Sequence, residues 1–107
     1  MLAGMPSKIL LEAIALQKSV TARYNRGGVR LAPHILYTRH AELHIDAVTL
    51  ERDGNPPRET KLGTFKLAGL TEIALDGRSF EPFAEFDPLA PRYEGATLFV
   101  IEIPAAA

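Results

Sequence analysis

The chain has 107 residues, of which 47% are hydrophobic and 23% charged, so residues 1–107 are expected to form a single folded domain. Twelve basic and thirteen acidic residues give a formal charge of −1, which excludes a general attraction to nucleic acid and leaves only local binding. The lack of cysteine excludes disulfides and thiolate metal sites. The lack of a basic and apolar leader favours a cytoplasmic protein. No apolar run approaches the roughly 20 residues that are needed to cross a membrane.

A helix is predicted over residues 6–18, with Ser7 as its N-cap because a serine hydroxyl can accept from a free amide of the first turn. Its apolar positions follow the i, i+3, i+4, i+7 spacing of a helix that packs on a sheet. The stripe consists of Leu10, Ala13, Ile14 and Gln17, widened by Leu11 and Leu16.

A barrel core is predicted over residues 20–70, where the hydrophobic period changes to two. Gly27-Gly28 is the expected tight turn of the first hairpin. Pro33 cannot donate to a strand ladder, so it indicates an edge position, a bulge or a break, and we expect it to bend its strand.

The next strand pair is predicted on either side of a turn at residues 53–57. Leu43, Ile45 and Ala47 share one parity, and the apolar side changes after Ala47, which indicates a β-bulge there. Residues 58–67 are the expected partner strand.

Residues 71–103 are predicted to hold an aromatic loop and a last strand. Residues 70–75 fit either a short strand or a helical turn. Residues 80–93 combine three prolines with three phenylalanines, so a loop that packs through its aromatic rings is expected, and a stacking platform for bases is the alternative. The run ATLFVIEI at residues 96–103 is apolar on both parities, as in a strand covered on both faces.

These elements give an α+β, mainly β fold, and three segments of it resemble the WYL family. An Ala13-Ile14 pair precedes a strand that ends at Tyr24, and PHILYTRHAELHIDA at residues 33–47 is similar to the core of the family. Phe65-Lys66-Leu67 resembles its Phe-Arg-Leu segment. The chain departs from the family where Leu43-His44-Ile45 replaces the Trp-Tyr-Leu tripeptide and where Ala68-Gly69-Leu70 replaces Asp-Arg-Ile.

The resemblance implies a small antiparallel β-barrel of five or six strands, SH3-like or Sm-like, with an N-terminal helix. WYL modules commonly follow a helix-turn-helix domain in bacterial transcription regulators and are thought to sense ligands that include nucleotides and nucleic acid. This chain has no room for that DNA-binding domain, so it resembles a stand-alone, degenerate member. Only His44 and Lys66 carry over as site residues.

The predicted hairpin gives these two residues a common location. If the turn is centred near Asn55, residues whose numbers sum to 110 face each other, so His44 opposes Lys66 while Leu43, Ile45, Phe65 and Leu67 turn inward. Two cationic groups side by side on the outer face favour an anion between them, such as a phosphate, and Arg39 and Arg58 extend the patch. A plain solvated face beside Asp46 is the alternative.

Other chemistry finds less support in the sequence. His40, Glu42, His44 and Asp46 share a parity, but alternate strand residues lie about 6.6–6.8 Å apart, too far to converge on one metal ion. No nucleophile motif and no phosphate-binding glycine loop is present, so neither a metal, a cofactor nor a catalytic residue is predicted.

The sequence therefore predicts a non-catalytic, ligand-sensing or nucleic-acid-binding regulatory module. Its expected partners are an anionic small molecule or single-stranded nucleic acid, together with a second copy of the chain or a regulator subunit. The alternative is a structural protein that oligomerises through exposed strand edges. A small hydrolase would need a cleft that joins a carboxylate with His34, His40 or His44.

Overall fold

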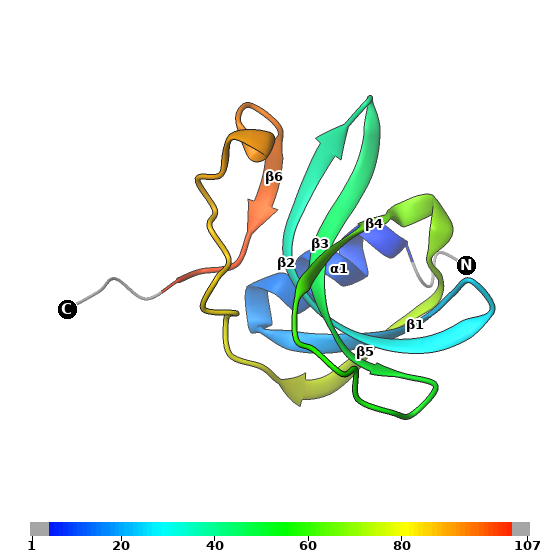
Figure 1. Ribbon diagram of the computed structural model, residues 1–107. Helices are drawn as coiled ribbons and strands as arrows, with labels where there is room; N and C mark the ends of the chain where they lie inside the picture. The colour runs from blue at the N-terminus through cyan, green and yellow to red at the C-terminus, as the bar shows by residue number, and fades with distance from the viewer. Residues whose placement is uncertain (1–4, 104–107) are drawn as a thin grey trace.

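One antiparallel sheet and one helix make up most of the fold (Figure 1). The computed structural model describes residues 5–103, in which the elements are α1 (Pro6–Leu16), β1 (Lys18–Tyr24), β2 (Gly27–Arg39), β3 (Glu42–Arg52), β4 (Leu62–Lys66), the 3-10 helix η1 (Leu67–Gly69), β5 (Thr71–Ser79), the 3-10 helix η2 (Pro91–Tyr93) and β6 (Thr97–Val100). The six strands follow the order β4-β3-β2-β1-β5, and β6 pairs with β2 outside this path. The predicted α+β, mainly β class is confirmed, but the sheet is not closed between β4 and β5.

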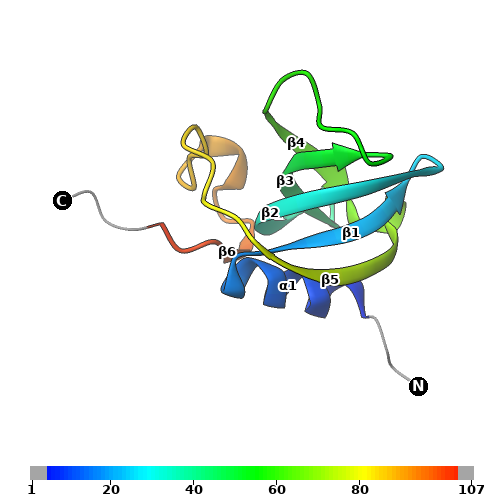
Figure 2. The same cartoon turned by 90° about the horizontal axis from the view of Figure 1, so that it is seen from below.

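The helix α1 lies against β1 and β5 (Figure 2) and contributes its predicted apolar stripe to the core. Leu10, Ala13 and Ile14 are fully buried, as the spacing predicts. Leu11 and Leu16 were wrongly assigned to that stripe, since both side chains are exposed. The N-cap is Met5, without a side-chain cap, because Pro6 takes the first helical position and displaces Ser7 into the first turn. No helix within residues 5–103 is long and apolar enough to span a membrane.

The β1–β2 hairpin turns at Asn25-Arg26, two residues before the predicted position. Both turn residues have positive φ angles, 48° and 66°, the geometry of a tight two-residue hairpin. Gly27 and Gly28 begin β2 instead. A Cβ on Gly27 would lie 3.3 Å from Asp53 Oδ1, and the Gly28 amide donates to that same oxygen at 3.0 Å. Gly27 therefore allows a close approach of the loop after β3, while a Cβ on Gly28 would meet no atom within 4 Å.

Strand β2 is bent at Pro33, as predicted, and pairs with different strands on the two sides of the bend. Before the bend β2 pairs with β1, and after it Ile35 to Tyr37 pair with β6. β3 pairs along both halves, with a register shift between Pro33 and Ile35. A second shift leaves Leu50 of β3 unpaired, so the bulge predicted in this strand after Ala47 lies three residues later, and the shift beside Ala47 belongs to β2.

The β3–β4 pairing has the predicted register. His44 faces Lys66 and Ile45 faces Phe65. The loop between these strands is longer than predicted, because Arg52 bridges to Asn55 and β4 begins only at Leu62. Arg52 therefore does not face Arg58.

The last third of the chain first pairs with β1, through β5, and later with the second half of β2, through β6. Within residues 5–103, strand β5 pairs only with β1, and it contains two residues with positive φ, Glu72 and Gly77. Residues 80–93, which we call the aromatic segment, then lead to β6. Phe86 is buried in the core and Phe80 and Phe83 pack against it, so the aromatic rings serve packing, as predicted.

Strand β6 is less covered than its composition suggests. It pairs only with β2, and Leu98 is 55% exposed. The expected coverage on both faces was therefore wrong for this strand.

The four inward side chains of the β3–β4 pair occupy one core. Ile45, Phe65 and Leu67 belong to the buried cluster, and Leu43 packs against it. The same cluster includes residues of α1, β1, β2 and the aromatic segment. The outer side of β3 is covered as well, by η2 and Tyr37, and this second layer carries the candidate site.

Candidate anion-binding site

The candidate site rests on a buried carboxylate, Asp46 of β3, whose side chain is fully inaccessible to solvent. The hydroxyl of Tyr37 donates to Asp46 Oδ1 at 2.6 Å, and that of Thr64 donates to the same oxygen at 2.8 Å. Asp46 Oδ2 accepts from the Tyr93 hydroxyl and lies 3.0 Å from Nη2 of Arg92. Three hydroxyl donors and one arginine thus satisfy a charge that would otherwise be costly to bury.

Three elements, β2, β4 and η2, carry the groups that surround Asp46. Tyr37 lies on β2 next to the strand carrying Asp46, and Thr64 faces Asp46 directly in the β3–β4 register. Arg92 and Tyr93 belong to η2, where the Tyr93 carbonyl accepts from the Ala96 amide at 2.9 Å. The short helix therefore brings two polar side chains to a strand 46 and 47 residues earlier in the chain.

The ring packing around Asp46 keeps water away from the tyrosine hydroxyls. Tyr37 and Tyr93 meet edge to face with centroids 5.0 Å apart. Burial, and next the hydrogen bond to Asp46, raises the pKa of both phenols, so both stay protonated donors. The Tyr93 hydroxyl in turn accepts from Arg92 at 2.9 Å and helps to raise the pKa of that guanidinium.

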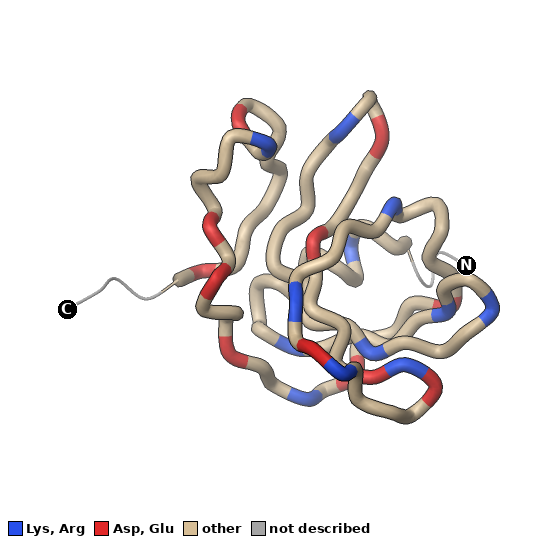
Figure 3. Tube along the Cα trace, in the orientation of Figure 1, with Lys and Arg blue, Asp and Glu red and all other residues tan. Residues whose placement is uncertain are grey.

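Beside this network lies a cavity of about 430 Å³, lined by Tyr37, Arg39, His40 and Arg92. Arg39 and His40 come from the tip of the β2–β3 hairpin, and Arg92 comes from η2. Figure 3 shows basic positions both on that hairpin and on the turn around η2, beside it. The Arg92 side chain is 56% exposed, so it presents donors to the cavity while one nitrogen contacts Asp46.

The charge balance of the cavity favours an anion. Among residues 5–103, Arg39 takes part in no ion pair. Its partner in the β2–β3 register is Glu42, which is held instead by Lys66 at 2.9 Å. The hydrogen bond from Lys66 lowers the pKa of Glu42, in keeping with a stable pairing of those two charges. Arg39 is thereby left with its charge unmatched.

The predicted pair of His44 and Lys66 is adjacent, but its surroundings differ from those expected. His44 is only 8% exposed, its Nδ1 lies 3.0 Å from the Glu42 carbonyl oxygen, and its ring packs near that of Tyr37. The expectation that His44 meets solvent was therefore wrong, since the Tyr37 ring lies beside the His44 ring. The acidic partner that relieves the charge on Lys66 is Glu42.

The two arginines of the predicted patch lie at opposite ends of β3. Arg39 is at the hairpin tip, next to the first residue of β3, while Arg58 is exposed in the loop that follows its last residue. An eleven-residue strand is about 36 Å long. Arg58 is therefore separate from the cavity. Sequence reasoning did not select Arg92 or Tyr93, since nothing local in the sequence indicates that η2 docks on β3.

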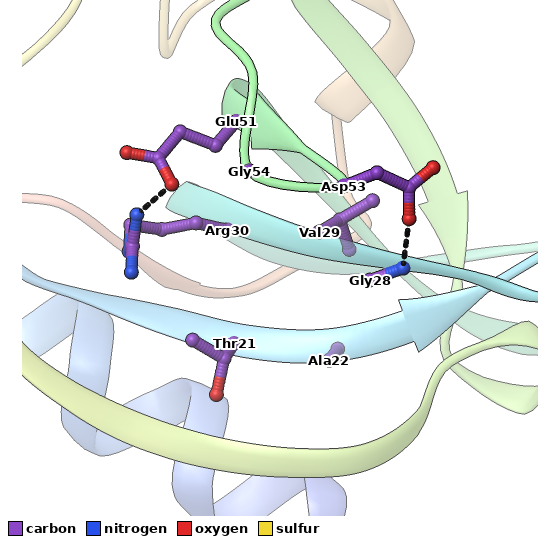
Figure 4. Close-up of a pocket in the computed structure, with 8 residues that line it drawn as sticks. All are labelled: Thr21, Ala22, Gly28, Val29, Arg30, Glu51, Asp53 and Gly54. Atoms are coloured by element: carbon purple, nitrogen blue, oxygen red, sulfur yellow. Dashed lines mark hydrogen bonds and ion pairs between the residues drawn. The ribbon is translucent and has the colours of Figure 1, made fainter.

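A second cavity, of about 250 Å³, lies between the β1–β2 hairpin and the loop after β3 (Figure 4). Its charged side chains are already paired: Arg30 contacts both Glu51 and Asp76, and Asp53 accepts from the Gly28 amide. The Ser19 hydroxyl donates to Asp76 at 2.8 Å and lowers the pKa of that carboxyl, followed in effect by Arg30. This arrangement serves to fasten β1, β2, β3 and β5 together.

The histidines do not form a metal centre within residues 5–103, where no group of three metal-ligating side chains comes together. Only His40 lines the cavity. Both ring nitrogens of the buried His34 lie within hydrogen-bond distance of backbone atoms, and His44 is covered.

Comparison of the chain with protein-family models, with curated proteins and with solved structures finds no match.

Proposed function

We propose that this chain is a non-catalytic binding module that recognises an anionic ligand in the cavity formed by Tyr37, Arg39, His40 and Arg92. The observation that carries the proposal is the convergence of two distant basic segments on one cavity. The buried Asp46 fixes Arg92 from behind, so this guanidinium is oriented before a ligand arrives. Arginine donors held in place in this way suit the planar or tetrahedral oxygens of carboxylates and phosphates.

The ligand class we infer is a phosphate-bearing small molecule, such as a nucleotide, or the backbone of single-stranded nucleic acid. The local charge suits such a ligand although the whole chain has a formal charge of −1. The bent, open sheet with its single helix is interpreted as a degenerate form of the SH3-like barrel of WYL modules. In this interpretation the chain senses its ligand for a bacterial transcription regulator and acts with a partner chain or a second copy.

The test is a titration with sulfate, adenosine monophosphate and a short single-stranded oligonucleotide, followed by NMR amide shifts and by calorimetry. We expect saturable binding at the cavity. Arg39→Gln should weaken the affinity by about tenfold. This corresponds to the lower end of the range for a hydrogen bond to a charged group, and solvent weakens such a bond at the exposed Arg39. Arg58→Gln is the matched control, with the same change at the other end of β3, and should alter the affinity less than twofold.

Two results would contradict the proposal. One is the absence of shifts around the cavity with all three probes. The other is an equal loss of affinity in Arg39→Gln and Arg58→Gln, which would indicate diffuse attraction to surface charge.

A further inference from the structure

A buried histidine holds the aromatic segment in place. His34 lies at the bend of β2 and is fully inaccessible to solvent. Its Nδ1 is 2.8 Å from the Ala32 carbonyl oxygen, and its Nε2 is 2.9 Å from the Phe83 amide nitrogen. Since a carbonyl can only accept and an amide N–H can only donate, the neutral ring with hydrogen on Nδ1 satisfies both contacts.

The environment of His34 supports this neutral form. Its ring packs against Phe80 and Phe86, with centroids 5.3 and 5.2 Å away. Burial lowers the pKa of His34, while the Ala32 carbonyl and the charge of Asp46 on β3 act in the opposite direction. On α1, the aromatic segment and the residues after β6, the charged groups are exposed, namely Lys8, Glu12, Glu81, Glu85, Asp87, Arg92 and Glu102.

A chain of contacts joins His34 to the anion site. Phe86 contacts the His34 ring on one side and packs against Tyr93 on the other, with centroids 6.0 Å apart. Tyr93 and its neighbour Arg92 bind Asp46. The contact of Phe83 with His34 and the contacts of η2 with Asp46 thus fasten the two ends of the same segment to the β2–β3 hairpin.

We propose that His34 is a proton-sensitive switch that controls the anion site, because a second proton on its ring would set two donors, Nε2–H and the Phe83 amide, against each other. The repulsion, together with the cost of a buried cation, releases the aromatic segment and moves Arg92 away from the cavity. This inference rests on the proposed function, since it concerns the regulation of that same cavity.

The sign and size of the effect follow from linkage. In the released segment His34 is hydrated and has a pKa near its ordinary value of 6.5, whereas the closed state binds the proton more weakly. Between those two pKa values, the ratio of released to closed protein rises about tenfold for each unit by which the pH falls. Above about pH 7 the closed state is unaffected.

The first measurement is amide hydrogen exchange of the whole chain between pH 7.5 and 5, with correction for the intrinsic exchange rate. Protection of the Phe83 amide should fall by up to about tenfold per pH unit below pH 6.5, while amides of β3 keep theirs. In His34→Gln, whose side-chain oxygen can accept from Phe83 and does not titrate, protection should be independent of pH. In His34→Asn, whose shorter side chain cannot reach Phe83, it should be low throughout.

The second measurement is sulfate affinity over the same range, since sulfate keeps its charge at these pH values. It is made in a His40→Gln background, because protonation of His40 in the cavity would strengthen anion binding and mask the switch. Affinity should fall with pH when His34 is present and stay constant in the His34→Gln double variant.

The outcomes separate the two proposals. Failure of sulfate, adenosine monophosphate and the oligonucleotide to bind at pH 7.5 would overturn the proposed function, and the exchange data would still decide whether His34 releases the segment. Binding at pH 7.5 with affinity and Phe83 protection that are both independent of pH would overturn the switch alone. An equal pH dependence in wild type and His34→Gln would also overturn it.

Discussion

The acceptor role of Asp46 predicts that Asp46→Asn, a change of one atom, strongly destabilises the protein. Asp46 Oδ1 accepts from Tyr37 and Thr64, while Oδ2 accepts from Tyr93 and forms an ion pair with Arg92. An asparagine replaces one oxygen by an NH₂ group, which can only donate. In either orientation of the amide, the groups on one side lose their acceptor, so a hydroxyl there must turn its proton away or give up its bond, and the negative charge that pairs with Arg92 is lost.

The expected cost follows from these contacts. A hydrogen bond to a charged group contributes about 1.5–3 kcal/mol, and Arg92 can recover part of its loss because it reaches solvent. We therefore expect the free energy of unfolding to fall by about 2–4 kcal/mol, a large share of the roughly 5–15 kcal/mol typical of a domain. The melting temperature should fall by about 10–30 °C.

The assay is urea unfolding followed by tyrosine fluorescence, which suits a chain with three tyrosines and no tryptophan. Asp53→Asn is the matched control: Asp53 is exposed, its φ of 51° suits asparagine, and an amide oxygen can still accept from Gly28. It should change stability by less than about 0.5 kcal/mol. If Asp46→Asn were as mild as this control, with an unchanged denaturant slope, Asp46 would not be the common acceptor.

Two further predictions concern the helix and a turn. In thermal denaturation, Leu10→Ala should lower the free energy of unfolding by about 2–5 kcal/mol, because Leu10 is fully buried. Leu16→Ala should lower it by less than about 0.5 kcal/mol, because Leu16 is 54% exposed. Equal losses would refute the assignment of the helix face. Ala41→Gly should stabilise by about 0.5–1 kcal/mol, because φ at Ala41 is 63°, while the same change at Ala74 in β5 should destabilise by a similar amount. Calorimetry that gave both glycine variants the same sign would contradict this reasoning.

The pairing of β3 with β4 was predictable because it depends on neighbouring segments of the sequence. Alternation of apolar residues specifies which side chains turn inward, and a turn between two such strands specifies their register. The facing of His44 and Lys66 followed from that reasoning alone. The bend at Pro33 was predictable as well, since a proline cannot donate to the ladder.

The burial of the outer side of β3 was not predictable in this way. A charged residue at Asp46 reads as solvent-facing, because the residues that cover it lie 46 and 47 positions later in a segment without regular periodicity. The turn at Asn25-Arg26 was missed for a different reason. Glycines are the usual residues at positive φ, but here Gly27 lies close to Asp53 and the Gly28 amide binds it, which only the folded loop reveals.

The irregular course of β5 has a consequence for how this open sheet behaves in concentrated solution. Its outer border is free, and a foreign polypeptide could in principle add itself there. Glu72 and Gly77 turn the backbone out of line on either side of residues 73–76, and alternate residues of that stretch point toward β1, so an incoming chain finds only about two outward amides. So short an edge does not support fibre growth, and β5 is protected from aggregation although the sheet does not close into a barrel.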